Sequence, residues 1–315
     1  MDVSVFCAQE GIDLDQIEAA KDFVLLRLLD DAVDALLVSD DIKRRYLSLA
    51  SRVNRLYKAV LPDHKAVEFA KARALFVIIA EKIRSIGRPP GISDVLDHVR
   101  ELLEESIDVS WVELQEWIQP TQIDLSKLDI KALKARFAAG PHKRTRAEQL
   151  RHALESKIEK MVEVNRSRVD YQEQLERMIE EYNKSTDVET LLKQLFSLTE
   201  ELEKEDARAV AEGFTEEELA IYDLLARSEA SLSETERQQV KKVTRVLLQR
   251  LKDKLVIDWR KKQQSRATVK LSIEECLDHL PREADDRKMV CQAIYQHVYD
   301  SYFGEGTSVY VSAGD

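Results

Sequence analysis

The hydrophobic positions of this chain repeat at helical spacing. The clearest series steps by four and three residues through Ile42, Tyr46, Leu49, Val53, Leu56 and Val60. Such steps place apolar side chains on one face of an α-helix, and Pro62 marks the end of that helix. A similar series precedes it, and another follows with Leu75, Ile79, Ile83 and Ile86. Short polar joints between the series predict helices that run antiparallel in a bundle.

A second helical region begins near residue 146. The apolar pattern predicts one long helix from Arg146 to Tyr182, although three polar residues interrupt its apolar face, namely Asn165, Arg168 and Gln172. Polar residues in such positions either fix the register of packed helices or mark contact with another protein. Farther along, two Ser/Thr-x-x-Glu sequences predict helix starts. They are Thr215 with Glu218 and Ser233 with Glu236.

Breaks in these patterns predict the domain organisation. Helical signals weaken over residues 109–145, which contain Pro120 and the Gly140–Pro141 pair. The fold expected is all-α with two helical lobes, an antiparallel bundle over residues 1–108 and a long-helix bundle over residues 146–303. An irregular connection with one short helix, residues 109–145, joins them. Residues 304–315 are expected to form a flexible tail.

Composition supports the helical prediction and indicates a compartment. Only 8 Gly and 6 Pro occur among 315 residues, so few positions force turns. The three cysteines, Cys7, Cys276 and Cys291, form no CxxC pair, which is typical of the reducing cytoplasm. The longest apolar run, Ala74 to Ala80, is too short to cross a bilayer. We therefore expect a cytoplasmic protein with no membrane contact.

Charge is distributed unevenly along the chain. The net charge is -11, yet residues 241–270 contain eleven Lys or Arg and two Asp. The segment just upstream, residues 180–236, contains seventeen acidic and five basic residues. Five residues of the basic segment are candidates for contacting DNA or a partner: Arg260, Lys261, Lys262, Gln264 and Arg266. On a helix, Arg260 would share a face with Gln264 at i+4 spacing, and Lys262 with Arg266, while Trp259 points inward. Alternatively, they pair with the acidic segment upstream.

Motifs for catalysis are missing from the sequence. There is no GxxxxGK[ST] phosphate loop, no HExxH and no GxSxG. The six histidines show no metal-ligand spacing, and the carboxylates lie in charged helical segments, so no catalytic, cofactor-binding or metal residue is assigned. Cys276 and Cys291 are interpreted as core residues, and His297 as a hydrogen-bonded core histidine.

Four segments carry a family resemblance. Residues Val256 to Ala267 look like the C-terminal helical region of the R (restriction and motor) subunit of type I restriction-modification enzymes. Further matching segments follow the same order as in that family: Arg166–Tyr171 with Ile179–Asn183, Thr215–Leu225, and Tyr295–Tyr302. The resemblance is specific from Leu150 to Tyr302 and weaker from Leu36 to Ile86.

The resemblance implies that this chain is a piece from the end of an ATP-dependent DNA translocase and nuclease. It would dock that motor onto a methyltransferase core of modification and specificity subunits, and would itself be no enzyme. ATP and Mg²⁺ would belong to other domains of the parent subunit, with no cofactor and no small-molecule substrate here. Two alternatives stay open: a helical module that grips duplex DNA through the basic segment, and a free-standing helical adaptor.

Overall fold

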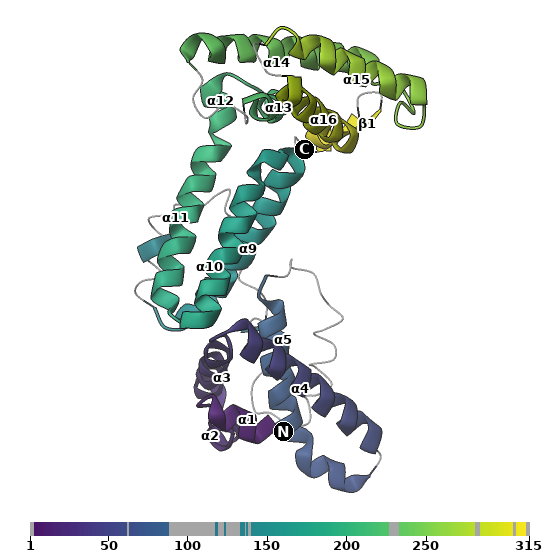
Figure 1. The fold of residues 1–315 in the computed structure, drawn as a ribbon. Coiled ribbons are helices and arrows are strands. Elements are labelled where there is room, and N and C mark those ends of the chain that lie inside the picture. Colours follow the sequence, from purple (N-terminus) through teal and green to yellow (C-terminus); the bar gives the residue numbers. More distant parts are fainter. Residues whose placement is uncertain are drawn as a thin grey trace. The chain divides into compact units, whose positions relative to one another are not determined.

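The computed structural model describes residues 3–61, 63–87, 117–118, 123, 133–135, 137, 140–226, 233–280, 284–304 and 307–312. Within these ranges the chain is almost entirely helical, and the exception is one small two-stranded sheet (Figure 1). The all-α prediction is confirmed.

The chain divides into two compact units that alternate along the sequence. Unit 1 contains Met1–Ser156 and Gln174–Glu200, and unit 2 contains Lys157–Glu173 and Glu201–Asp315. Three helices therefore contribute residues to both units: α9 (Lys143–Val164), α10 (Val169–Ser185) and α11 (Val188–Asp206). The expected lobe boundaries at residues 108 and 146 and the connection between them stay predictions, and most of residues 88–139 lie outside the described ranges.

Unit 1 is built from short and long helices around one core. Its remaining elements are α1 (Val3–Gln9), α2 (Leu14–Ala19), α3 (Asp22–Leu36), α4 (Asp40–Val60), the 3-10 helix η1 (His64–Phe69) and α5 (Ala70–Ser85). Helices α4 and α5 run antiparallel. The Tyr46 hydroxyl donates to the Phe76 carbonyl at 3.1 Å, and Asn54, later on α4, accepts from Arg73, which comes earlier on α5. Tyr46 is fully buried, so the first half of the α4 apolar face forms core.

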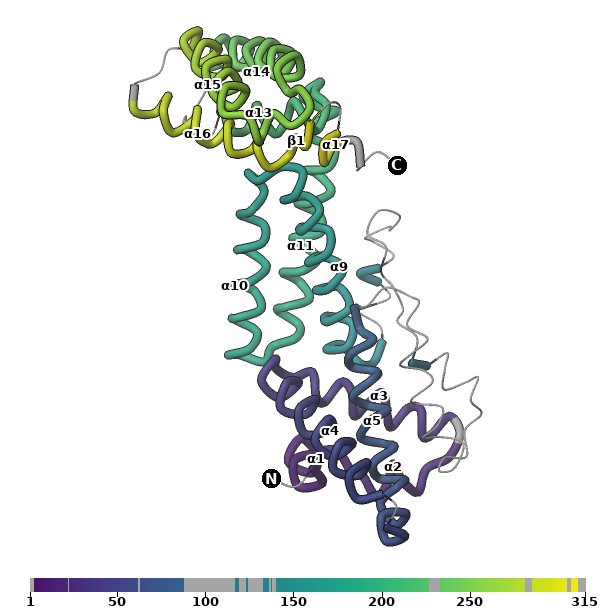
Figure 2. Tube along the Cα trace, turned by 90° about the vertical axis from the view of Figure 1, so that its right-hand side faces the viewer, coloured from purple at the N-terminus to yellow at the C-terminus, as the bar shows by residue number. Residues whose placement is uncertain are grey.

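Unit 2 packs its helices around a second core. Its elements are η2 (Arg166–Arg168), α12 (Arg208–Glu212), α13 (Glu216–Ala226), α14 (Glu234–Lys254), α15 (Gln263–Leu277), α16 (Ala284–Ser301), β1 (Tyr302–Gly304), β2 (Thr307–Ser308) and α17 (Val309–Ser312). Helices α13, α14, α15 and α16 lie against one another in both views (Figures 1 and 2). Both predicted capping boxes are present at the starts of α13 and α14, where Ser233 and Thr215 each exchange hydrogen bonds with the glutamate three residues on.

The single long helix predicted from Arg146 to Tyr182 is wrong, because the chain breaks at Asn165. Helix α9 ends at Val164 and α10 begins at Val169. Asn165 is fully buried in an extended conformation, and its amide accepts from the Ser167 N–H at 3.0 Å and donates to Asp223 at 2.8 Å. A buried amide needs such partners, and leaving the helix provides them.

Part of the segment expected to be a flexible tail has regular structure instead. β1 and β2 pair antiparallel with Tyr302 opposite Ser308, and α17 follows directly. Ser308 is buried, and the hydroxyl of Tyr310 donates to the Val164 carbonyl at 3.0 Å. These contacts anchor residues 307–312 to the end of α9.

Candidate functional site

Three of the candidate residues, Arg260, Lys261 and Lys262, lie in a turn that is fixed by a buried tryptophan, and the other two lie at the start of α15 (Gln263–Leu277). This basic turn, residues 255–262, joins α14 to α15. Trp259 has no exposed surface, and its indole N–H donates to the Tyr302 carbonyl at 3.3 Å. The Tyr299 ring meets it edge-on at 5.8 Å between centroids. Asp258 adopts a left-handed φ of 58° just before it. The chain thus leaves the helix so that Trp259 can enter the core.

Arg260 packs against aromatic rings. Its guanidinium lies 5.1 Å from the centroid of Tyr299 and 4.7 Å from that of Phe303. Its carbonyl accepts a hydrogen bond from Arg266 at 3.2 Å. Stacking of this kind suits the planar, weakly hydrated guanidinium. Arg260 therefore braces the turn.

Lys261, Lys262 and Gln264 are exposed. The ammonium of Lys261 lies 2.9 Å from Asp258, and this hydrogen bond, with the charge of the carboxylate, raises the pKa of the lysine. Lys262 forms no salt bridge with any residue that the structure describes. The prediction that Arg260 and Gln264 share a helix face is wrong, because α15 begins only at Gln263 and Arg260 lies in the turn before it.

Pairing with the acidic segment occurs, but elsewhere in the basic segment. Lys241 lies 2.7 Å from Glu212, and Lys252 lies 2.6 Å from Glu217. Both lysines are on α14. Within the described ranges, none of the five candidate residues is paired with residues 180–236. The internal interpretation therefore applies to α14, and the turn keeps exposed cations.

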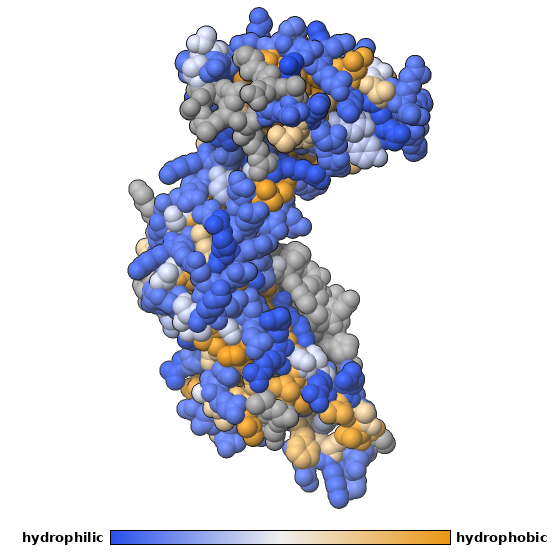
Figure 3. Space-filling view, in the orientation of Figure 1, coloured by the Kyte–Doolittle hydropathy of each residue, from blue (hydrophilic) through white to orange (hydrophobic). Residues whose placement is uncertain are grey.

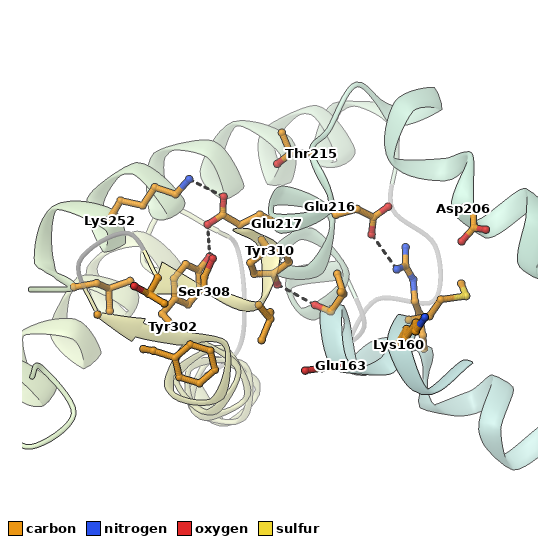
Figure 4. A pocket seen from close by; sticks show the side chains of 18 residues that line it. Lys160, Glu163, Asp206, Thr215, Glu216, Glu217, Lys252, Tyr302, Ser308 and Tyr310 are labelled. Atoms are coloured by element: carbon orange, nitrogen blue, oxygen red, sulfur yellow. Dashed lines mark hydrogen bonds and ion pairs between the residues drawn. The ribbon is translucent and has the colours of Figure 1, made fainter. Parts of the chain in front are cut away.

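A cleft of about 1280 Å³ lies beside the basic turn (Figure 4). Its labelled lining residues come from five helices, two strands and one connecting segment of unit 2: Lys160, Glu163, Asp206, Thr215, Glu216, Glu217, Lys252, Tyr302, Ser308 and Tyr310. The Tyr302 hydroxyl donates to Glu217 at 2.7 Å, and Lys252 holds the other carboxylate oxygen. Burial, and then the charge of Glu217, raise the pKa of Tyr302 far above its usual value. The hydroxyl stays protonated and acts as a structural donor.

An ionic cluster at the break between α9 and α10 forms part of the wall of the cleft. Arg168, 4% exposed, contacts Glu205 at 3.0 Å and Glu216 at 2.9 Å. Burial alone would lower the pKa of Arg168, but the hydrogen bond with Glu216 and the surrounding carboxylates outweigh it and raise that pKa. Arg208 bridges Glu205 to Asp223. Two of the polar residues that interrupt the predicted helix, Asn165 and Arg168, thus fix packing within unit 2, whereas the third, Gln172, is exposed.

His297 is a core residue, as predicted. It is 2% exposed, with Nε2 at 2.8 Å from the Tyr310 hydroxyl and Nδ1 at 3.4 Å from Ser301. Since the Tyr310 hydroxyl already donates to Val164, Nε2 of the histidine must carry the proton. Burial and the nearby Arg166 lower the pKa of His297 to about 4, so the ring is neutral at pH 7.

The sequence matches a known family over nearly all of its length. Residues 3–301 match the family described as "Type I restriction enzyme HindI endonuclease subunit-like, C-terminal". The chain belongs to this family. The sequence resemblance is thereby confirmed, and the match extends beyond the segment from Leu150 to Tyr302 that carried it most specifically.

Two relatives support the assignment to this type I restriction family. The HindI endonuclease subunit of a type I restriction enzyme from Haemophilus influenzae is 25% identical over 109 residues, covering 34% of this chain and 10% of the relative. A Methanocaldococcus jannaschii protein assigned as the MjaIXP endonuclease subunit is 25% identical over 248 residues, covering 74% of this chain and 23% of the relative. The chain thus spans less than a quarter of either relative. No solved structure matches it.

The described part of this type I restriction family member contains no group of three or more His, Cys, Asp or Glu residues placed to hold a metal ion. Cys7, Cys276 and Cys291 are buried and form no disulfide, and the last two lie in the unit 2 core as predicted. No described helix is long and apolar enough to cross a membrane.

One important residue of the ionic cluster was missed from sequence. Asp223 accepts hydrogen bonds from Asn165 and Ser167 and lies beside Arg208. The signal was available: it is the only charged residue in the run from Leu219 to Leu225. A lone carboxylate among apolar residues predicts a buried partner for its charge.

Proposed function

We propose that this chain is a non-catalytic assembly region of a type I restriction endonuclease subunit. It would dock the ATP-dependent translocase and nuclease of its parent subunit onto the modification and specificity subunits. Two observations support a fragment role: the family is a C-terminal region, and the chain spans under a quarter of the endonuclease subunits it resembles.

The observation that carries the proposal is the mixed composition of the basic turn surface. Val256 is 49% exposed, Ile257 57% and Phe303 52%, next to Arg260 and the two lysines. The turn with Val256 and Ile257 lies next to the strand that carries Phe303. A side-chain carbon at Gly304, the residue after Phe303, would lie 3.5 Å from the Val256 carbonyl oxygen. Exposed aliphatic and aromatic side chains gathered beside an Arg are typical of a protein interface.

The test is assembly with the purified modification and specificity subunits of the same enzyme. We expect this chain to co-elute with that core on gel filtration. Ile257→Asp should weaken the complex at least about tenfold, because it places a carboxylate at the centre of the apolar contact. Leu271→Asp is the matched control, since Leu271 on α15 is 54% exposed and lies outside the surface. Unchanged binding by Ile257→Asp, or no complex at micromolar concentrations, would refute the proposal.

A duplex-DNA grip is the second candidate, and the exposed lysines favour it. Residues 254–270 contain six basic residues and one acidic residue. Phosphate contacts would give an affinity that falls steeply with salt. In that case Lys261→Glu with Lys262→Glu should abolish DNA binding while Ile257→Asp leaves it intact. If Ile257→Asp instead weakens binding to the modification and specificity subunits more than the double lysine variant does, the assembly proposal is supported.

A further inference from the structure

A shallow apolar groove lies on unit 1, where the α4 apolar face leaves the core. It has a volume of about 440 Å³. Its lining is mainly hydrophobic and comes from α1, α4, η1 and α5; the residues used below are Arg52, Val53, Leu56, Val60 and Phe69. Hydrophobic side chains over α4 are visible in the lower part of Figure 3.

The groove exposes apolar side chains that the sequence pattern assigns to a packed face. Tyr46 and Ala50, in the first half of α4, are 0% and 1% exposed. Leu56 and Val60 continue the same series but are 61% and 53% exposed, and Phe69 across the groove is 64% exposed. Large apolar side chains gathered on one surface mark an interaction site. The second half of this helix face therefore has large exposed apolar side chains that a partner could cover.

Positive charge is concentrated on the segment that forms most of the groove, and Arg52 is among its lining residues. Between Ile42 and Arg73 there are nine Lys or Arg and two acidic residues. Four of the cations, Arg52, Arg55, Lys58 and Lys65, are exposed and form no salt bridge with any residue in the described ranges. A complementary partner must therefore combine an apolar stripe with acidic flanks.

The partner's backbone is constrained as well. The described part of unit 1 contains no strand, so it offers no sheet edge for an added strand. A groove bordered by helices, with apolar side chains at i and i+4 such as Leu56 and Val60, accepts the apolar face of another helix. We propose that this groove binds an acidic amphipathic helix of a partner protein. The inference extends the proposed function by naming a second docking surface and the chemistry of its ligand.

The first test uses a peptide and needs no other subunit. The probe is a fluorescein-labelled synthetic helix of about 20 residues, long enough to form a stable helix, with Leu on one face and Glu on its flanks. Fluorescence anisotropy should show binding to this chain that weakens as salt is raised. A peptide with Lys in place of every Glu should bind at least ~10-fold more weakly. Equal affinity for the two peptides, or no binding of either, overturns the inference.

Matched double variants locate the site. Val60→Glu with Phe69→Glu places two carboxylates in the groove and should reduce acidic-peptide binding at least ~10-fold. Val24→Glu with Phe23→Glu is the control on α3: Val24 is 53% exposed, the same as Val60, and Phe23 is 78% exposed. Circular dichroism melts of both variants verify folding. Equal losses in the two variants, or unchanged binding by the groove variant, would place the site elsewhere.

Other occupants give distinct results. If a DNA duplex displaces the peptide, and its binding requires Arg52 and Lys58 but not Phe69, the ligand of the groove is DNA and not a helix. If sedimentation shows a dimer of this chain, and the groove variant is monomeric, the ligand of the groove is a second copy of the chain. Failure of the two proposals is also distinguishable. Peptide binding without co-elution of the methyltransferase core refutes only the proposed function, whereas co-elution without groove-dependent peptide binding refutes only this inference.

Discussion

His152 joins a cluster of charged side chains in unit 1, and its protonation should stabilise the fold. Its Nδ1 lies 2.9 Å from Glu155 and its Nε2 lies 3.3 Å from Glu148. Lys43 and Arg151 contact the same Glu148 at 2.6 Å and 3.5 Å. The hydrogen bonds to Glu148 and then Glu155 raise the pKa of His152 from 6.5 to about 9, against the effect of burial. The folded state therefore binds this proton more tightly than the unfolded state.

The magnitude follows from the pKa shift. A shift from 6.5 to about 9 corresponds to roughly 3 kcal/mol at about 1.4 kcal/mol per unit. The side chain is 32% exposed, and solvent screening reduces the contribution to about 1–2 kcal/mol. Because the folded pKa is raised, this stability is fully present below pH 6.5 and is lost as the pH rises through about 9.

The assay compares urea unfolding of the wild type and His152→Gln, followed by circular dichroism at several pH values. The free energy of unfolding of the wild type should exceed that of His152→Gln by about 1–2 kcal/mol below pH 6.5. Above pH ~9.5 the difference should shrink to the part that does not depend on the charge of the histidine. His64→Gln is the control, since the His64 side chain is 93% exposed, and it should change little at any pH. A difference for His152→Gln that stays constant across this range would refute the reasoning.

Three further predictions follow from the described contacts. Gly87→Ala should destabilise the chain by more than Gly11→Ala. Both glycines have positive φ, but a side-chain carbon at Gly87 would lie 2.4 Å from the His152 ring, whereas one at Gly11 would face open space. The melting temperature of the Gly87 variant should therefore be the lower of the two. Asn165→Ala should lower the free energy of unfolding by about 1–3 kcal/mol in urea titrations, because it removes a buried hydrogen bond to Asp223. Purified protein with ATP, magnesium and plasmid should neither release phosphate nor nick DNA, and activity that co-purifies with the chain would contradict the non-catalytic role.

Local sequence determined the helical character of this protein and much of its core. Few Gly and Pro, helical apolar spacing and two capping boxes specify helices through neighbouring residues alone, which is why these predictions were confirmed. Four single residues were also assigned to the core from the sequence, and all are buried: Trp259, His297, Cys276 and Cys291. Matching segments of the sequence also sufficed to identify the family.

Tertiary structure decided where helices stop and which apolar faces stay exposed. The break at Asn165 depends on Asp223, 58 residues away, because a buried amide is stabilised only by partners that folding brings to it. The turn before α15 exists because Trp259 reaches the Tyr302 carbonyl, 43 residues farther on. Periodicity places Tyr46 and Val60 on one face of α4, but burial depends on what packs there, and only the neighbours of Tyr46 are supplied by this chain in its described residues.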